Sequence, residues 1–486
     1  MTQTPGRHDA TSPRGLRWWV LLGVMASWRL GAQWRPEERV MLSDFSYVDA
    51  VAASPWLVFA ATRHGLLVYD RVTGKWRPPV TTLDGYPSSR VRTAIADQAA
   101  NAVWLGVGGI DGYVRYDVDA RMWTRGIPPP PDAQSQVLTV EAALARAPAA
   151  DALRSLILTD RRLQSHRFTA AASTPDRAEL YFGTDGLGLV RLDPRTGEFE
   201  VLPYGLLATG VGALAPADEG GIWAATNARP GGAERRGLTW VAADLSATRP
   251  AEGGGAALGF TFLVARRLLA TAGALWLATE QGVMQIAPGP MMRLRLYDVP
   301  QTTSLAPAPD GVWVGTTRGL SVVTRDGNVE RLATDFPVLS LVAVRETLWV
   351  GTNAGVVMVP PGKDAAGVAA LTQPIYAMTR ARDTILAATD RSLVWRDPAT
   401  GTWKELPLSL ALGRPTSLAA DPDGGVWIGG TQGLARADLG RSLIRTLTVP
   451  MDLPAPVRDV LADADYLWAA TDSGLVRFDR RAVRSR

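Results

Sequence analysis

Short apolar runs alternate with short polar turns along most of the chain. An aromatic or apolar residue, two small or apolar residues and then, usually, threonine form a motif that recurs ten times. The copies begin at Phe59, Trp104, Tyr181, Trp223, Trp276, Trp313, Trp349, Leu386, Trp427 and Trp468. Three residues after the threonine there is usually glycine, and another apolar run follows, as in GLLVYD (65–70) and GLVRFD (474–479). This pattern predicts short β-strands joined by tight turns.

The copies follow one another at intervals of about 40 residues, the length of a unit of four short strands. The interval between Trp104 and Tyr181 is longer. A single sheet cannot bury both of its faces, so repeated sheets must pack against one another. The sequence therefore predicts an all-β fold, a β-propeller of about ten four-stranded blades. A single ring closed by N- and C-terminal strands is favoured, and two smaller propellers are the alternative.

The last unit has no fourth strand, because only DRRAVRSR follows Phe478. Near the start of the chain, QWRP (Gln33–Pro36) matches KWRP (Lys75–Pro78), where a fourth strand is predicted. We infer that Trp34 and its neighbours supply the outer strand of the final blade. Such a shared blade would remove an exposed sheet edge.

Residues 1–32 have the parts of a secretory signal. An apolar run, WWVLLGVMA (18–26), follows three arginines, and the small residues Gly31 and Ala32 come after it. The run is shorter than the roughly 20 residues that span a bilayer. We expect 1–32 to be a secretory signal peptide, or an N-terminal anchor, and 33–486 to be the propeller. The protein is then periplasmic or extracellular, and peripheral to the membrane at most unless the N-terminal segment is retained.

Charge and composition narrow the function classes. The net charge of +4 arises mostly in residues 1–32, which hold four arginines and one aspartate, while the remainder has 47 basic and 46 acidic residues. A nearly neutral body gives little attraction for nucleic acid, so no nucleic-acid partner is expected. The absence of cysteine excludes disulfides and thiol nucleophiles.

Two segments depart from the repeat. Residues 125–175 combine PPPP (128–131) with a helix-forming stretch, which predicts an insertion over one face or a degraded extra blade. Residues 227–257 are rich in Gly, Arg and Pro, which predicts a long mobile loop.

Two stretches, LDGYPSSRVRTAIAD (83–97) and DLPAPVRDVLADADYLWAATDSGLVRFD (452–479), resemble the two-component regulator propeller repeat. The resemblance implies an extracytoplasmic sensory propeller that binds ligands such as glycans. This chain shows no kinase or regulator pattern and no second membrane span. A signalling role would therefore require a separate partner protein.

Groups for catalysis are few. The histidines are His8, His64 and His166, and a triad or a histidine-rich metal site is hard to build from them. We expect no enzyme activity, no cofactor and no metal site. The stretch ADPDGG (420–425) resembles the start of a calcium loop. Similar acidic stretches precede the second strand of other units, which favours a hairpin turn.

The loops between second and third strands all emerge on one face of a propeller, and here they are polar and carry both signs of charge. The candidate ligand- or partner-binding residues in them are Arg63, His64, Glu280, Gln281, Arg318, Asn353, Asp390, Arg391, Gln432 and Asp472. They favour a non-catalytic exported scaffold that binds an envelope protein, a membrane complex, a polar ligand or a glycan. A periplasmic sensory module of a split two-component system is the first alternative. A propeller-type lyase or glycan hydrolase using His64, Glu280 and Asp390 is the second.

Overall fold

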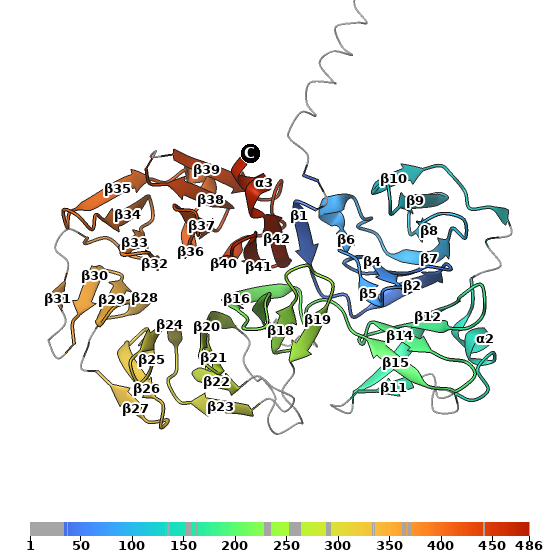
Figure 1. The fold of residues 1–486 in the computed structure, drawn as a ribbon, viewed down its shortest axis with the longest axis horizontal. Helices are drawn as coiled ribbons and strands as arrows, with labels where there is room; N and C mark the ends of the chain where they lie inside the picture. The colour runs from blue at the N-terminus through green and yellow to red at the C-terminus, as the bar shows by residue number, and fades with distance from the viewer. Residues whose placement is uncertain are drawn as a thin grey trace, which may run out of the picture.

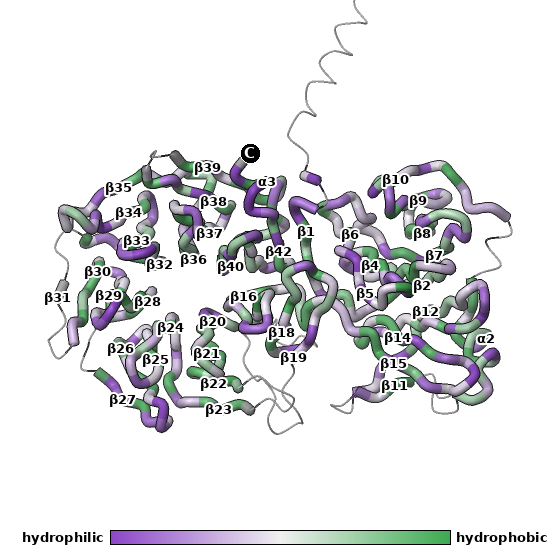
Figure 2. Tube along the Cα trace, viewed as in Figure 1, coloured by the Kyte–Doolittle hydropathy of each residue, from purple (hydrophilic) through white to green (hydrophobic). Residues whose placement is uncertain are grey.

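The computed structural model describes residues 34–485 apart from 36, 132, 134–136, 151–156, 161–163, 228–234, 252–263, 288–292, 333, 335, 362–365, 368–370 and 441–442. The chain forms ten antiparallel sheets of four or five strands, as the repeat predicts (Figure 1). In Figure 2 the hydrophobic residues lie mainly along the strands and many turns are hydrophilic. The predicted signal segment, 1–32, lies outside the described residues.

Seven of the sheets form a closed group, which we call the ring. Its strands are β16 (Gly210–Pro216), β17 (Ile222–Asn227), β18 (Leu238–Val241), β19 (Thr248–Ala251); β20 (Ala265–Thr271), β21 (Ala274–Thr279), β22 (Val283–Ala287), β23 (Arg293–Tyr297); β24 (Thr302–Ala308), β25 (Gly311–Thr316), β26 (Gly319–Thr324), β27 (Val329–Arg331); β28 (Val338–Val344), β29 (Thr347–Thr352), β30 (Gly355–Val359), β31 (Ala366–Gly367); β32 (Ala377–Ala381), β33 (Thr384–Ala388), β34 (Ser392–Arg396), β35 (Trp403–Pro407); β36 (Pro415–Ala420), β37 (Val426–Gly430), β38 (Gly433–Asp438), β39 (Leu443–Thr448); and β40 (Val457–Ala462), β41 (Tyr466–Thr471), β42 (Gly474–Asp479) with β1 (Arg39–Leu42).

The other three sheets form an open group, which we call the arc. Its strands are β2 (Val48–Ala53), β3 (Leu57–Thr62), β4 (Gly65–Asp70), β5 (Lys75–Trp76), β6 (Val80–Thr81); β7 (Val91–Ala96), β8 (Ala102–Val107), β9 (Tyr113–Asp117), β10 (Met122–Arg125); and β11 (Ile157–Thr159), β12 (Ser165–Ser173), β13 (Leu180–Thr184), β14 (Leu189–Leu192), β15 (Phe199–Leu202). The described helices are α2 (Val140–Leu144) and α3 (Arg480–Ser485), with 3-10 turns at Thr82–Asp84 and Leu410–Leu412.

The prediction of one ten-blade ring is wrong. The inner strands of the ring, from β16 through β40, lie side by side in chain order, and β40 lies beside β16 to close the circle (Figure 1). In the arc, β2 lies between β7 and β12. The repeat spacing specifies sheets but not which sheets are neighbours, since neighbour choice depends on packing between distant segments. The alternative of two propellers comes closer, although the arc is open.

The shared blade is confirmed. Strand β1 pairs with β42 from Arg39 opposite Phe478 to Leu42 opposite Leu475. The matched tetrapeptide is not itself the strand, because Trp34 precedes β1 and packs its ring 5.2 Å from the Phe478 ring. After β1 the chain builds the whole arc and only then enters β16. The arc is therefore inserted within the closing sheet of the ring.

A common hydrophobic core joins the two groups. Phe45, Trp76, Tyr204 and Trp468 belong to one buried cluster that takes residues from both ring and arc. The rings of Trp76, on β5, and Tyr204, just before β16, stack at 5.1 Å between centroids. Each buried aromatic side chain contributes on the order of 2 kcal/mol. Ring and arc are thus attached through packed side chains as well as through the chain itself.

Described residues of the segment 125–175 cover the two end sheets of the arc. Ala143 on α2 and Ala147 pack against Phe182 of the sheet β11–β15. Ala133 packs against Ile95 and Trp104 of the sheet β7–β10. In the ring, the faces of each sheet are covered by neighbouring sheets instead. The same segment also contains β11 and β12, and its described residues form no additional sheet.

The predicted loop 227–257 is interrupted by strands, so the prediction of one continuous loop is wrong. β18 and β19 fall within it and complete the first ring sheet, while 228–234 and 252–257 lie outside the described residues. The alternation in LTWV (238–241) was hidden by the surrounding Gly, Arg and Pro. Trp240 pairs across the sheet with Trp223.

The recurrent Thr-x-x-Gly turn has a structural cause. Thr352 Oγ1 donates to the Gly355 carbonyl oxygen at 2.9 Å and accepts from Ala354 N at 3.0 Å. Gly355 has a φ of 121°, and a Cβ there would lie 1.8 Å from the Leu371 carbonyl oxygen. Only glycine fits this approach of two backbones.

Candidate functional site

The loops between second and third strands lie at the end of the ring where the inner strands begin, because the first two strands of each sheet are antiparallel. We call this end the mouth. Six of the seven ring sheets bring predicted residues there: Glu280, Gln281, Arg318, Asn353, Asp390, Arg391, Gln432 and Asp472. The loop of the seventh sheet runs from 228 to 237, and only Arg235, Arg236 and Gly237 of it are described.

Arg63 and His64 are not brought to the mouth, so that part of the predicted site is wrong. They lie in the β3–β4 loop of the arc, because the same turn motif occurs in both groups of sheets. The Arg63 guanidinium carbon lies 3.5 Å from the centroid of the Tyr47 ring. Burial lowers the pKa of His64, and Asp44 acts in the opposite direction.

Sequence reasoning missed a second set of residues at the mouth, which we call the rim. Five of them follow the first residue of an inner strand, Gly212 follows the second residue of β16, and all six are bulged out of the pairing with the second strand, whereas Tyr376 directly precedes β32. The rim consists of Gly212, Arg266, Thr303, Leu339, Tyr376, Thr416 and Arg458. A β-bulge re-aims a side chain without a fixed residue type, so no sequence motif marked these positions.

Two rim threonines tie neighbouring sheets together. Thr303 Oγ1 donates to the Val338 carbonyl oxygen at 2.7 Å, and Thr416 Oγ1 donates to the Val457 carbonyl oxygen at 2.8 Å. Each bond runs from one inner strand to the first residue of the next. These bonds fix the rim positions of adjacent sheets relative to each other.

At β16 the rim carries no side chain, because its residue there is Gly212, followed by Ala213; we call this position the notch. A Cβ on Gly212 would lie 2.2 Å from the Ala265 carbonyl oxygen, so the position accepts no side chain. Arg267, on β20, reaches past this notch and donates from Nη1 to Asp459 Oδ1 on β40 at 2.9 Å. The ion pair therefore links the sheets on both sides of β16.

Asp459 is buried, with 3% of its surface exposed. Burial raises the pKa of its carboxyl group, while Arg267 opposes the shift. Oδ2 accepts from Leu214 N at 2.9 Å and Oδ1 also accepts from Val460 N at 3.0 Å. The carboxylate is thus surrounded by donors and holds Arg267 in place.

Two further arginines flank the notch. Arg458 forms a two-point ion pair with Asp472, from Nε at 2.8 Å and from Nη2 at 2.6 Å, and hydrogen bonding to Asp472 raises the pKa of Arg458. Arg266 is exposed, and no residue in the described part of the chain forms an ion pair with it. Its guanidinium donors are therefore available to solvent.

On the far side of the mouth the rim residues are Leu339 and Tyr376. The Arg414 guanidinium carbon lies 5.5 Å from the centroid of the Tyr376 ring. Burial and then the nearby Asp390 raise the pKa of Tyr376. This side of the mouth therefore offers an apolar side chain and an aromatic ring.

The arc holds both described histidines. His166, with 8% of its surface exposed, lies between Asp160 and Asp185, with Nε2 3.4 Å from Asp160 Oδ2 and Nδ1 3.6 Å from Asp185 Oδ1. Across the described ranges, no three His, Asp or Glu side chains are grouped so that they could hold a metal ion. The same ranges contain no helix long and apolar enough to cross a bilayer.

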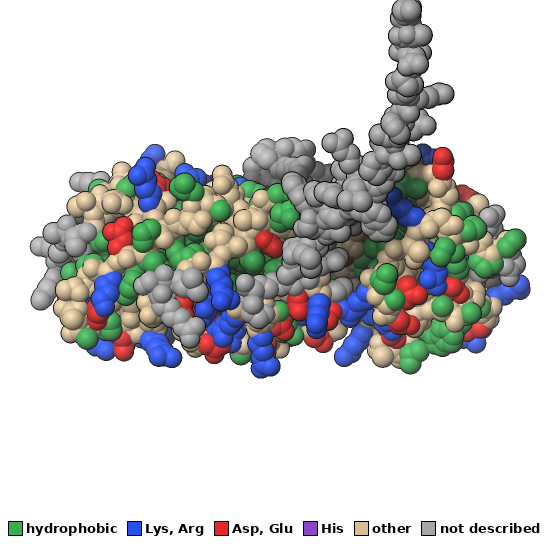
Figure 3. Space-filling model, turned by 90° about the horizontal axis from the view of Figure 1, so that it is seen from above, with side chains coloured by type: hydrophobic (Ala, Val, Ile, Leu, Met, Phe, Trp, Pro, Cys, Tyr) green, Lys and Arg blue, Asp and Glu red, His purple; other side chains and the backbone are tan. Residues whose placement is uncertain are grey.

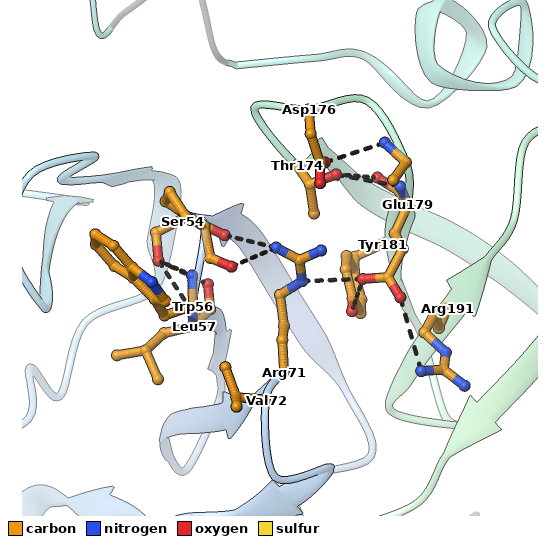
Figure 4. A network of polar contacts seen from close by, with 12 residues as sticks. Ser54, Trp56, Leu57, Arg71, Val72, Thr174, Asp176, Glu179, Tyr181 and Arg191 are labelled. Carbon is orange, nitrogen blue, oxygen red and sulfur yellow. Dashed lines mark hydrogen bonds and ion pairs between the residues drawn. The ribbon is translucent and has the colours of Figure 1, made fainter.

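In the arc, an ion pair joins the turns of two neighbouring sheets. Arg71 Nε lies 2.9 Å from Glu179 Oε2, which also accepts from the Tyr181 hydroxyl at 2.7 Å (Figure 4). Arg71 further donates to the carbonyl oxygens of Ser54 and Pro55. The contact joins the first and third sheets of the arc. Figure 3 shows charged side chains of both signs crowded along one edge of the molecule.

The stretch ADPDGG is a hairpin turn between β36 and β37, as predicted. Its carboxylates bind arginines of the following segments. Asp421 accepts from Arg436 Nε at 2.7 Å, from Arg480 Nη1 at 3.1 Å and from Arg484 Nη2 at 2.5 Å, and Asp423 pairs with Arg480 and Arg484. Helix α3 is thereby fixed to the neighbouring sheet.

No family model and no curated protein matches the sequence. Among solved structures, the chain is similar to PorZ, an essential bacterial surface component of the type-IX secretion system of Porphyromonas gingivalis. The identity is 12%, the match covers 91% of this chain and 87% of that one, and the TM-score is 0.53.

Two further similar structures have a TM-score of 0.46. Virginiamycin B lyase from Staphylococcus aureus is 14% identical over 55% of this chain and 94% of its own. The extracellular domain of a proposed one-component system from B. thetaiotaomicron is 13% identical over 89% of this chain and 70% of its own. The ten antiparallel sheets give the fold of a propeller, and at 12% identity the similarity to PorZ bears on that fold alone.

Proposed function

We propose that the protein is an exported, non-catalytic propeller that binds a ligand or a partner protein at the mouth and acts as a scaffold in the cell envelope. The observation that carries the proposal is the convergence of polar loops from six ring sheets at one end of a closed ring. Functional groups on loops held by a rigid scaffold are typical of binding surfaces. The surface location of PorZ is in keeping with an envelope setting.

The absence of catalysis is part of the proposal. His64, which a lyase reading would require, lies in the arc and not beside Glu280 and Asp390. A general base must lie within hydrogen-bond reach of the groups it serves. The mouth offers donors and acceptors for recognition, and the proposal assigns them that role alone.

A second candidate function is supported by the sequence resemblance. The repeat resembles the two-component regulator propeller repeat, whose propellers are sensory modules. In this alternative the mouth binds a glycan or a small polar ligand, and the protein docks on a separate membrane kinase. Capture of a histidine kinase with the purified protein would favour this candidate over the scaffold.

The test is affinity capture of the full chain from envelope extracts, together with cell fractionation. The mouth variant combines Arg318→Ala, Asn353→Ala and Gln432→Ala. The control combines Asp310→Ala, Arg325→Ala and Arg345→Ala in turns at the other end of the ring. The proposal expects envelope localisation and a captured partner or ligand that the mouth variant loses and the control retains. Retention by the mouth variant, or a cytoplasmic location of the wild type, would refute it.

A further inference from the structure

The mouth is chemically divided into two sides. Strands β40, β16 and β20 are consecutive in the ring and carry Arg458, the Gly212 notch, Arg266 and Arg267. Strands β28 and β32, with Leu339 and Tyr376, lie across the ring from them (Figure 1). Of the seven rim positions, the charged ones are confined to the first side. A ligand that spans the mouth therefore meets Arg266, Arg267 and Arg458 at one end, and at the other end Leu339 and the Tyr376 ring, with Arg414 beside that ring.

We propose that the mouth binds a small ligand carrying an oxyanion, a phosphate or a carboxylate, with the anion at the arginine side and an apolar or aromatic part against Leu339 and Tyr376. The inference rests on the proposed function, since it names the ligand chemistry of the same mouth. It assigns Arg266 and Arg267, neither of which was among the residues predicted from sequence.

The arginine side is suited to an oxyanion because its carboxylates are already engaged. Asp459 is buried and accepts from Arg267 and from two backbone amides. Asp472 forms an ion pair with Arg458, and Glu280 Oε2 accepts a hydrogen bond from Val264 N at 3.0 Å. Arg266 has no acidic partner among the described residues. Guanidinium groups make strong, often paired hydrogen bonds to phosphate and carboxylate oxygens.

Arg267 is also positioned to bind the oxyanion. Asp459 fixes one Nη group, while 38% of the side chain stays exposed. Asn227 adds a neutral donor, because its Oδ1 accepts from Ala265 N at 2.8 Å and its amide nitrogen has no acceptor in the described part of the chain. A Cβ at Gly212 would lie 2.4 Å from Asn227 Oδ1, so the glycine allows the Asn227 side chain to lie against β16.

The test measures binding of two matched pairs of probes to the full chain by calorimetry. Inorganic phosphate is compared with phenyl phosphate, and acetate with benzoate. We expect the aromatic member of at least one pair to bind more tightly than its simple partner. Tighter binding of the phosphate pair would assign a phosphate ligand, and tighter binding of the carboxylate pair a carboxylate ligand. No binding of any probe up to about 10 mM would overturn the inference.

Variants locate the two ends of the ligand. Arg266→Ala should weaken phenyl phosphate or benzoate binding about tenfold, the effect of one charge-assisted hydrogen bond. Leu339→Ser should weaken the aromatic probes about fivefold and leave inorganic phosphate and acetate unchanged. Arg325→Ala, at the other end of the ring, is the matched control and should change neither. Unchanged binding of the aromatic probes by Arg266→Ala would overturn the inference.

The outcome is separable from that of the proposed function. If the envelope partner is still lost in the mouth variant while no anion binds, the scaffold role stands and the oxyanion inference falls. If the anions bind and respond to Arg266→Ala, but the mouth variant retains its envelope partner, the partner-binding role falls and the anion site stands.

Discussion

The ring and the arc are built from the same repeat and yet bury their sheets in different ways. In the ring each sheet is covered on both sides by a neighbour, and β1 pairs with β42 to close it. In the arc the two end sheets lack a neighbouring sheet on one side, and α2 covers one of them and Ala133 the other. The difference shows that this repeat does not determine closure. Closure depends on which segments supply the last covering layer.

The largest expected effect comes from opening the ring at β1. Val40 is 2% exposed in the core that joins ring and arc. Val40→Asp places a charge there and should lower the free energy of unfolding by about 4 kcal/mol. Val329→Asp, on the outer strand β27 with 37% exposure, is the control and should cost less than about 0.5 kcal/mol. Chemical denaturation measures both, and equal effects would show that β1 does not close the ring.

After the pairing of β1, the second interaction that stabilises the ring is made by Asp421. Its side chain is fully buried beneath Arg436, Arg480 and Arg484. Asp421→Asn leaves Arg436 without a carboxylate and Arg480 and Arg484 with Asp423 alone, and it should lower the free energy of unfolding by about 3 kcal/mol at pH 7. The corresponding ion pair of the arc joins Glu179 to the half-buried Arg71. Glu179→Gln should lower the free energy of unfolding by about 1 kcal/mol. An equal cost at both sites would remove this distinction between ring and arc.

The same residue predicts a pH dependence. Burial acts to raise the pKa of Asp421, but hydrogen bonds from Arg436, Asp423 N and Arg484 outweigh it and hold the pKa below its usual value. A carboxyl whose pKa is lower in the folded state contributes its stability above the unfolded pKa, near 4, and loses it as the pH falls through the folded value. Wild-type stability should therefore fall below about pH 4 more steeply than that of Asp421→Asn. Parallel profiles in acid denaturation would contradict the assignment.

Uncovering an end sheet should loosen the arc alone. Ala147→Asp introduces a charge at a residue 2% exposed, against the sheet β11–β15. The expected cost is about 2 kcal/mol, confined to local unfolding of the arc. Hydrogen exchange followed by mass spectrometry should show faster exchange in β13–β14 and unchanged exchange in β20–β42. Ala145→Asp, at an exposed position nearby, is the control. Faster exchange throughout the ring would mean that the two groups unfold together.

The smallest effect concerns the rim. Thr416→Val removes the hydrogen bond from β36 to the Val457 carbonyl oxygen and should cost about 1 kcal/mol. Thr169→Val removes the equivalent bond from β12 to the Val48 carbonyl oxygen in the arc. Thermal denaturation measures the two changes. Because the arc responds locally, Thr169→Val should lower the melting temperature much less than Thr416→Val does. A larger decrease for Thr169→Val would contradict this expectation.

Much of the fold follows from local signals. In each unit the aromatic residue lies in a strand, and the threonine and glycine form the tight turn that follows it. Ten sheets were therefore predictable. The partnership of β1 with β42 was predictable because the last unit lacks a strand. The grouping into seven and three was not, since Trp104 and Trp276 have the same local pattern although one lies in the arc and the other in the ring.

The candidate site shows the same limit. The mouth loops Glu280 to Asp472 follow the turn motif and were identified, but Arg63 and His64 share that motif and lie in the arc. The rim was missed because its residues range from Gly212 to Tyr376. What they share is a backbone position at the start of an inner strand, and a bulge is set by pairing between strands rather than by residue type.

The most direct test of this account is the arrangement of sheets seen by electron microscopy of the full chain down the axis of the ring. The account predicts class averages with seven sheets around one centre and three more attached beside them, at a fixed position set by the shared core of Phe45, Trp76 and Tyr204. A closed circle of ten sheets, or three sheets that take many positions relative to the seven, would contradict it.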